Sequence, residues 1–155
     1  MLGTVARKLR ILGFDTAYMA DTSDDEVLKL GIDQKRIIIT ADREFFKRIV
    51  AADGQGVLVS GTNELEDIVH IFSKLGIKSV QDKAIGSRCT ACNTPLEKKS
   101  STQIRGKVPV AVMESQTEFN ECPKCGKVYW NGSHMLRIRV FVKKLEAQLA
   151  KNSEQ

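Results

Sequence analysis

The four cysteines of the 155-residue chain form two Cys-x-x-Cys pairs, Cys89 with Cys92 and Cys122 with Cys125. Two intervening residues allow a tight turn to direct both sulfur atoms of a pair at one ion. Four thiolates complete a tetrahedral zinc site, and such a site leaves no open position for water. We therefore expect a structural zinc ion, Zn²⁺, bound by all four cysteines.

Two disulfides or a redox dithiol are the alternatives to zinc at these cysteines. The sequence shows no signal peptide and no apolar stretch long enough to span a bilayer, so we expect a cytoplasmic, reducing environment and no membrane partner. A reducing environment disfavours structural disulfides. A redox site would need only one of the two pairs, so zinc is the preferred interpretation.

A second set of candidate groups is acidic and comprises Asp24, Asp25 and Asp42. Hard cations such as Mg²⁺ and Mn²⁺ bind carboxylate oxygens and keep water ligands that can attack a phosphodiester. The alternative is structural. Asp24 and Asp25 would favour the amino end of a helix through its dipole, and Asp42 would cap a helix that starts at Arg43.

The two halves of the chain differ in charge. Residues 1–84 contain 12 Lys and Arg against 13 Asp and Glu, a net charge of −1. Residues 85–155 contain 12 against 6, a net charge of +6, and no Asp. Carboxylates that hold cations beside basic residues that hold phosphates would suit a metal-dependent enzyme acting on a polyanion. Many proteins show such an asymmetry by chance, so it is weak support.

The elements that position these groups alternate between strand and helix, which indicates an α/β domain with a parallel sheet. Buried strands are predicted at residues 36–40 and 56–60, with a further short strand at 14–19. Helices are predicted at residues 1–12, 23–31 and 43–52, and a longer one, capped by Thr62 or Asn63, extends to Leu75. Ser23 and Glu26 form a capping box, and Gly31 is expected to end that helix. Functional groups gather beyond the carboxyl ends of parallel strands, where Asp42 is expected.

The second half is expected to be a separate module. Residues 82–87 would link an α/β domain at residues 1–84 to a zinc ribbon and basic segment at residues 85–155. Ribbon strands are predicted at residues 108–113 and 127–130, with a polar loop at 97–102. Residues 135–151 are expected to form a basic amphipathic helix, or a strand that runs into one.

Several residues of the second half have side chains suited to RNA. Tyr129 and Trp130 can stack on bases, although such residues more often pack a zinc ribbon onto its neighbour. His134 can contact a phosphate or make a structural hydrogen bond. The basic residues that can bind phosphates are Lys98, Lys99, Arg105, Lys107, Arg137, Arg139, Lys143 and Lys144.

Five segments together resemble one known family. They are MLGTVARKLRILGFDT (1–16), SDDE (23–26), RIIITADRE (36–44), CTACN (89–93) and CPKCGKVYWNGSH (122–134). In content and order they are similar to the Mut7-type C-terminal RNase domain, a PIN-like nuclease domain that carries a zinc ribbon. The resemblance extends from Met1 to about Val140.

The resemblance implies a PIN-like α/β fold and a ribonuclease that depends on Mg²⁺ or Mn²⁺. It implies that Asp24 or Asp25, together with Asp42, bind the catalytic cation, and that the four cysteines bind zinc. Family members usually begin with a strand that ends in Asp just before the Met-Leu-Gly segment, so we expect this first strand to be absent here. They also usually have Arg where this chain has Ala41.

Two functional hypotheses follow from these patterns. In the first, the chain is a metal-dependent ribonuclease in which Asp24, Asp25 and Asp42 hold the cation and the basic half binds RNA. In the second, it is a non-catalytic RNA-binding or adaptor protein with a degenerate metal site.

Overall fold

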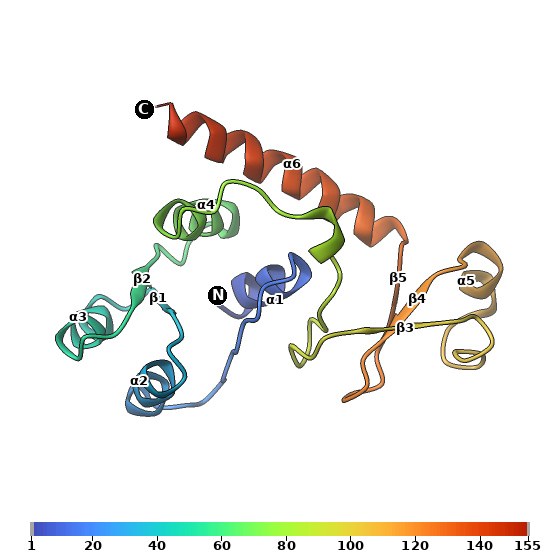
Figure 1. Cartoon of the computed structure of the whole chain (residues 1–155), viewed down its shortest axis with the longest axis horizontal. Coiled ribbons are helices and arrows are strands. Elements are labelled where there is room, and N and C mark those ends of the chain that lie inside the picture. The colour runs from blue at the N-terminus through green and yellow to red at the C-terminus, as the bar shows by residue number, and fades with distance from the viewer. Residues whose placement is uncertain (1, 155) are drawn as a thin grey trace.

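The described residues, 2–154 of a computed structural model, form two small sheets with helices packed around the first (Figure 1). The elements of the first half are α1 (Leu2–Ile11), α2 (Asp24–Asp33), β1 (Ile38–Thr40), α3 (Arg43–Ala51), β2 (Gly56–Leu58) and α4 (Glu64–Lys74). Those of the second half are a 3₁₀ turn η1 (Asp82–Ala84), β3 (Glu97–Lys99), α5 (Val110–Ser115), β4 (Phe119–Glu121), β5 (Val128–Trp130) and α6 (Ser133–Ser153). The mixed α/β class is therefore confirmed.

Polar side chains cap the N-termini of three of the first four helices. Ser23 and Glu26 form the predicted capping box at the start of α2, because each side chain accepts a hydrogen bond from the other residue's backbone N–H. Asp42 caps α3, and Asn63 caps α4. These contacts are local in sequence, and the predicted starts of these helices are confirmed.

The first sheet is parallel, with Ile38 opposite Gly56 and Thr40 opposite Leu58. Successive side chains of a strand point to opposite faces. Ile39 packs with a core built from α1, β2, α4 and α6, whereas Ile38 packs with Phe45 and Ile49 of α3. The sheet thus separates two layers of helices.

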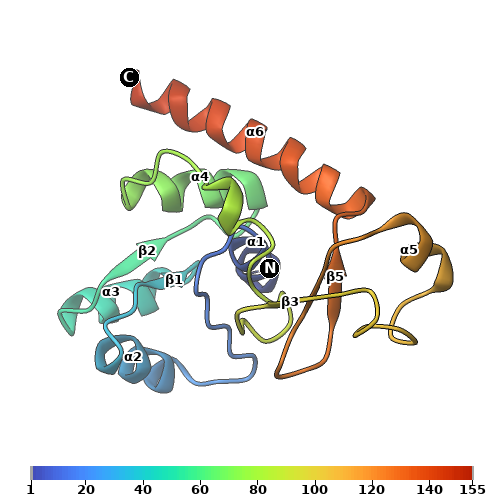
Figure 2. The same ribbon diagram turned by 45° about the vertical axis from the view of Figure 1, so that its right-hand side comes forward.

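The long helix α6 crosses from the second sheet to α4, and both views show it running beside α4 (Figures 1 and 2). Four of its residues are buried in the same core as α1 and α4: Ile138, Val142, Leu145 and Leu149. The alternating apolar residues at its start form no strand, because Leu136 and Val140 are exposed on the other side of the helix. The division at residues 84 and 85 stays a prediction, and α6 ties the second half to the core of the first.

The second sheet is an antiparallel ribbon with the order β3, β4, β5, at the opposite end of the molecule from α2 and α3 (Figure 1). The strand β5 was expected. The prediction of a polar loop at residues 97–102 is wrong in part, because Glu97–Lys99 pairs with β4. The prediction of a strand at residues 108–113 is also wrong. Pro109 has φ −57° and precedes the first turn of α5, where its missing N–H leaves no helical bond unmade.

Residues 14–19 do not form the predicted strand. Their backbone is used elsewhere, because Thr16 N–H donates to Asn93 Oδ1 (3.0 Å) and Thr16 O accepts from Arg10 Nε (2.8 Å). This segment therefore contacts the first Cys-x-x-Cys pair and not a sheet. Asp24 and Asp25 consequently follow a loop.

Gly31 does not end its helix as predicted, since α2 continues to Asp33. A Cβ atom at Gly31 would lie 2.6 Å from Ile38 Cδ1, so the glycine allows β1 to approach α2 closely. Within residues 2–154, no helix is long and apolar enough to cross a membrane.

Candidate functional site

The four cysteine sulfurs converge on one point. Their Sγ atoms all lie within 4.8 Å of one another, with Cys89 and Cys125 3.5 Å apart and Cys92 and Cys122 3.4 Å apart. A tetrahedral zinc ion with Zn–S bonds of about 2.3 Å would separate its sulfurs by about 3.8 Å. A disulfide needs sulfurs about 2.05 Å apart, so neither pair is bonded. The donor set fits a structural zinc ion.

Neighbouring groups hydrogen-bond to these sulfurs. Cys125 N–H donates to Cys122 Sγ (3.4 Å), and the Tyr129 hydroxyl lies 3.1 Å from Cys89 Sγ. Hydrogen bonding with the side chain and the backbone of Thr94 lowers the pKa of Cys92 to about 6. Such bonds favour the thiolate, which is the form that binds metal. Tyr129 is therefore part of the support of the metal centre.

The first Cys-x-x-Cys turn is bound to α1 through a buried arginine. Arg10 Nη1 donates to the carbonyl oxygens of Thr90 (2.9 Å) and Ala91 (3.0 Å), while its Nε donates to Thr16 O. Only 6% of Arg10 is exposed. Three carbonyl acceptors compensate part of the penalty of burying this guanidinium.

A second link to the same turn passes through Asn93, at φ +68°. Its Nδ2 donates to Asp15 Oδ1 (2.6 Å), and its Oδ1 accepts from Thr16 N–H. Arg36 Nη2 lies 2.9 Å from the same Asp15 oxygen. Hydrogen bonds, first from Arg36 and then from Asn93, lower the pKa of Asp15 to about 2. The metal centre is thereby attached to the loop that leads into α2.

Asp42 lies directly beyond β1, as the sequence predicted. Its Oδ1 accepts from the N–H groups of Glu44 (2.7 Å) and Phe45 (2.9 Å), and its own N–H donates to Thr40 Oγ1 (3.0 Å). Asp42 is therefore a helix cap in this structure, and its side chain is exposed. The structural alternative from the sequence is confirmed for this residue, while Oδ2 makes no hydrogen bond to the described residues.

Asp24 and Asp25 occupy the first turn of α2. Arg48 of α3 pairs with both: its Nη1 lies 3.6 Å from Asp24 Oδ2, and its Nη2 contacts Asp25 Oδ1. The two helices are joined at their surface by this arginine. Among residues 2–154, the cysteines are the only set of three or more Cys, His, Asp or Glu side chains grouped closely enough to share an ion. Binding of a cation by Asp24, Asp25 and Asp42 stays a prediction.

The predicted RNA-binding lysines and arginines lie on several elements. In the part of the chain that is described, Lys99 pairs with Glu97, Lys107 with Glu121 and Arg139 with Asp82. The remaining basic residues of that set make no ion pair within residues 2–154: Lys98, Arg105, Arg137, Lys143 and Lys144. The charges of these five are not offset by an ion pair within the described residues.

Tyr129, Trp130 and His134 line one small cavity where the ribbon meets α6. The cavity has a volume of about 130 Å³. The structure thus brings together the two aromatic residues and the histidine that the sequence singled out. Their binding to nucleic acid is untested by this geometry and stays a prediction.

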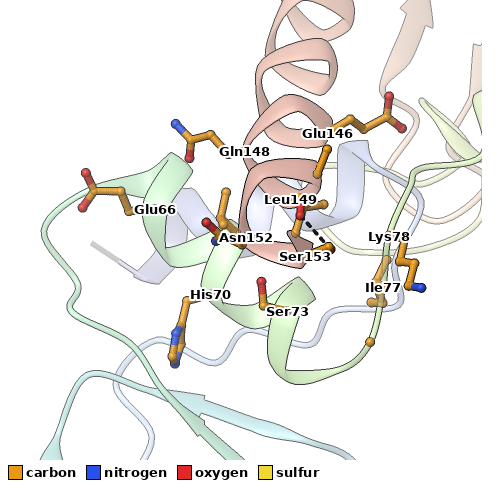
Figure 3. Close-up of a pocket in the computed structure, with 13 residues that line it drawn as sticks. Glu66, His70, Ser73, Ile77, Lys78, Glu146, Gln148, Leu149, Asn152 and Ser153 are labelled. Atoms are coloured by element: carbon orange, nitrogen blue, oxygen red, sulfur yellow. Dashed lines mark hydrogen bonds between the residues drawn. The ribbon is translucent and has the colours of Figure 1, made fainter. Parts of the chain in front are cut away.

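A larger groove of about 760 Å³ lies between α4 and α6 (Figure 3). Figure 3 shows Ser73 of α4 beside Asn152 and Ser153 of α6, with His70 directed away from α6. The groove contains none of the predicted site residues.

Sequence reasoning missed the residues that act across long separations. Arg10 lies 80 positions before Thr90, and Arg48 lies 23 positions after Asp25. Asp67 was also missed. It is 3% exposed and accepts from Ser60 Oγ (2.8 Å) and from the N–H groups that follow β2. Asn93 was missed as well, and its position directly after a Cys-x-x-Cys pair was the one sequence feature that could have indicated its role in attaching the cysteine turn.

Comparison with known proteins gives one family. The family model described as the Mut7-C RNAse domain matches residues 1–142. No curated protein and no solved structure matches the chain.

Proposed function

The chain belongs to the Mut7-C RNAse domain family, and we propose that it is a metal-dependent ribonuclease with a PIN-like α/β domain. The family indicates a ribonuclease-type function and RNA as the substrate class. The observation that carries the proposal is that Asp42 lies just beyond β1 with only Oδ1 engaged in capping α3, so that its Oδ2 is open to a ligand.

The three carboxylates have the chemistry that a hard cation requires. Oxygen ligands suit Mg²⁺ and Mn²⁺, and Asp24, Asp25 and Asp42 are all exposed. When bound, such an ion supplies an activated water and stabilises charge on the phosphate oxygens. We propose Asp24, Asp25 and Asp42 as the residues that would hold it.

The chain's own residues prepare this surface in two ways. The N–H groups of Glu44 and Phe45 fix one oxygen of Asp42 and leave the other for a ligand. Arg48 offsets the adjacent negative charges of Asp24 and Asp25. A cation that binds there must compete with this guanidinium, because both act on the same carboxylates.

RNA would be held by the second half of the chain. Phosphates attract lysine and arginine side chains, and the attraction weakens as salt concentration rises. The residues proposed to contact RNA are Lys98, Lys99, Arg105, Lys107, Tyr129, Trp130, His134, Arg137 and Arg139.

The variant Asp42→Asn tests the proposal. Asparagine caps helices as well as aspartate does, so α3 is expected to remain folded while the carboxylate charge is lost. We expect the rate of Mn²⁺-dependent cleavage of a single-stranded RNA to fall at least about 100-fold, because removing one electrostatic interaction with the transition state has an effect of this size.

Asp53→Asn is the matched control, because Asp53 lies just beyond the other end of α3 at φ +57°, which asparagine tolerates. This control is expected to cleave like the parent chain. Full activity of a folded Asp42→Asn variant would overturn the proposal.

One observation favours a second function, a non-catalytic RNA-binding or adaptor protein. Arg48 already pairs with Asp24 and Asp25, and within residues 2–154 the three acids do not form one close group. This function predicts salt-sensitive RNA binding without turnover. RNA cleavage that a chelator abolishes and added Mn²⁺ restores would exclude it.

A further inference from the structure

The cavity of about 130 Å³ between the ribbon and α6 is lined by both apolar and polar residues. Its apolar part consists of Ile11, Ile85 and Met135. Aromatic side chains contribute a further part, from Tyr129 and Trp130. The polar side chains that line it are Arg88, Thr90, Asn120, Asn131 and His134. A lining of apolar and aromatic side chains with a small number of polar groups is typical of small-molecule sites.

Most of these polar groups have no partner in the protein. Within residues 2–154, no hydrogen bond is made by the side chains of Asn120, Asn131 and His134 or by the Trp130 indole N–H. Arg88 makes one side-chain hydrogen bond, from Nη1 to Asn93 O (2.9 Å). No unpaired side-chain nitrogen or oxygen among the described residues is fully buried, so these groups on the cavity lining can be reached by solvent.

The walls of the cavity are held in place by the metal centre. The Tyr129 hydroxyl accepts from Thr90 N–H (3.3 Å) and lies beside Cys89 Sγ. Asn120 and Tyr129 are partners across β4 and β5. The Trp130 indole packs against Gly132, where a Cβ atom would lie 3.0 Å from Nε1. The cavity therefore exists as a preformed shape, which lowers the entropic penalty of binding.

The volume limits the ligand to one small ring. A cavity of about 150 Å³ accommodates benzene, so about 130 Å³ suits a single six-membered ring and is small for a purine. Two asparagine amides offer both donors and acceptors, as a base edge requires. The Trp130 indole offers a stacking surface.

We propose that this cavity binds one unstacked pyrimidine base of single-stranded RNA, with Asn120 and Asn131 contacting its polar edge and Trp130 its face. The inference rests on the proposed function for its choice of RNA, and it adds a base preference that this function does not contain. The neighbouring phosphates would meet His134 and Arg137, which share one face of α6 at a spacing of three residues.

Trp130 is the only tryptophan of the chain, so its fluorescence reports on this cavity alone. The zinc-loaded full chain is titrated with octamers of uridylate and of adenylate, without added Mg²⁺ or Mn²⁺. We expect a saturable change in fluorescence with the uridylate octamer and a Kd about tenfold lower than for the adenylate octamer, because the two asparagine amides would hydrogen-bond to the edge of the pyrimidine.

Asn120→Ala and Asn131→Ala are each expected to raise the Kd for uridylate roughly fivefold, the size of a lost hydrogen bond, with little change for adenylate. Asn152→Ala is the matched control, because Asn152 lies on the same helix as His134 but lines the other groove. Zinc content and circular dichroism establish that each variant is folded, and having two variants keeps the test valid if one fails to fold.

Equal affinity for the two octamers, or an unchanged uridylate Kd in both folded variants, would overturn the inference. Cleavage is assayed separately with Mn²⁺. If the chain prefers uridylate but cuts no RNA, the proposed ribonuclease function is contradicted and the base-binding inference is supported. If the chain cuts RNA but binds the two octamers equally, only the base-binding inference is contradicted.

Discussion

Asn93 Nδ2 donates a hydrogen bond of 2.6 Å to Asp15 Oδ1, and this contact joins the first Cys-x-x-Cys turn to the loop between α1 and α2. Together with the bond from Thr16 N–H to Asn93 Oδ1 and the bonds from Arg10 to Thr90 and Ala91, it connects the metal centre to the first half of the chain. The metal centre thereby helps to position the segment that leads to Asp24 and Asp25.

Replacing Asn93 by glycine is predicted to destabilise the chain by about 1–3 kcal/mol, because the bonds to Asp15 and Thr16 are both lost. Glycine keeps the φ of +68° without strain, so the change isolates the side chain. Asp53→Gly, at φ +57°, measures the entropic effect of glycine in the unfolded chain. Urea unfolding of the zinc-loaded proteins gives both values, and equal values for the two variants would contradict the prediction.

Asp15 is predicted to contribute a pH-dependent part of stability. Its pKa in the folded chain is lowered from 3.8 to about 2, chiefly by hydrogen bonds from Arg36. The folded state therefore favours the ionised form, and the contribution is present above pH 3.8 and is lost as the pH falls towards 2. We expect Asp15→Asn to be less stable than the parent chain at pH 5, with the difference shrinking as the pH falls through this window.

Urea unfolding of the two chains at matched pH values checks this prediction. Protonation of the cysteines and loss of metal affect both chains, so the difference between them isolates Asp15. A difference that stays constant from pH 5 to the acid limit of the folded state would show that Asp15 is not the titrating group.

Arg48→Gln is predicted to strengthen Mn²⁺ binding, because Asp24 and Asp25 would no longer be paired with a guanidinium. All three side chains are substantially exposed, so the expected gain is about two- to fivefold in Kd by isothermal titration calorimetry. Arg43→Gln removes the same charge from α3 at a residue that forms no ion pair within residues 2–154. An equal gain in both variants would attribute the effect to net charge and not to competition at the acids.

Structural features set by residues close together in the sequence could be predicted. The capping box of Ser23 and the caps at Asp42 and Asn63 follow from residues two or three positions apart. The cysteine quartet was also predictable, because two short turns and four equivalent ligands permit few arrangements.

Structure that depends on distant partners was not predictable from the same patterns. Residues 14–19 have the composition of a strand, but the backbone carbonyl and N–H of Thr16 are hydrogen-bonded to the side chains of Arg10 and Asn93. Ion pairing of Arg48 with two acids on another helix leaves no periodic signal in the sequence. Asp24, Asp25 and Asp42 could be singled out by residue type, whereas the pairing of Arg48 with two of them could not.

Tyr129→Phe is predicted to weaken zinc binding about tenfold, the usual effect of removing a group that hydrogen-bonds to a metal ligand. The phenol oxygen lies 3.1 Å from Cys89 Sγ, and phenylalanine keeps the ring in its half-buried position. The only other tyrosine, Tyr18, packs against Gly3, so Tyr18→Phe is the matched control. Competition with a chromophoric chelator gives the affinities. Loss of zinc affinity in Tyr129→Phe but not in Tyr18→Phe would assign the Tyr129 hydroxyl to the metal centre, whereas equal affinities would leave it as a packing group.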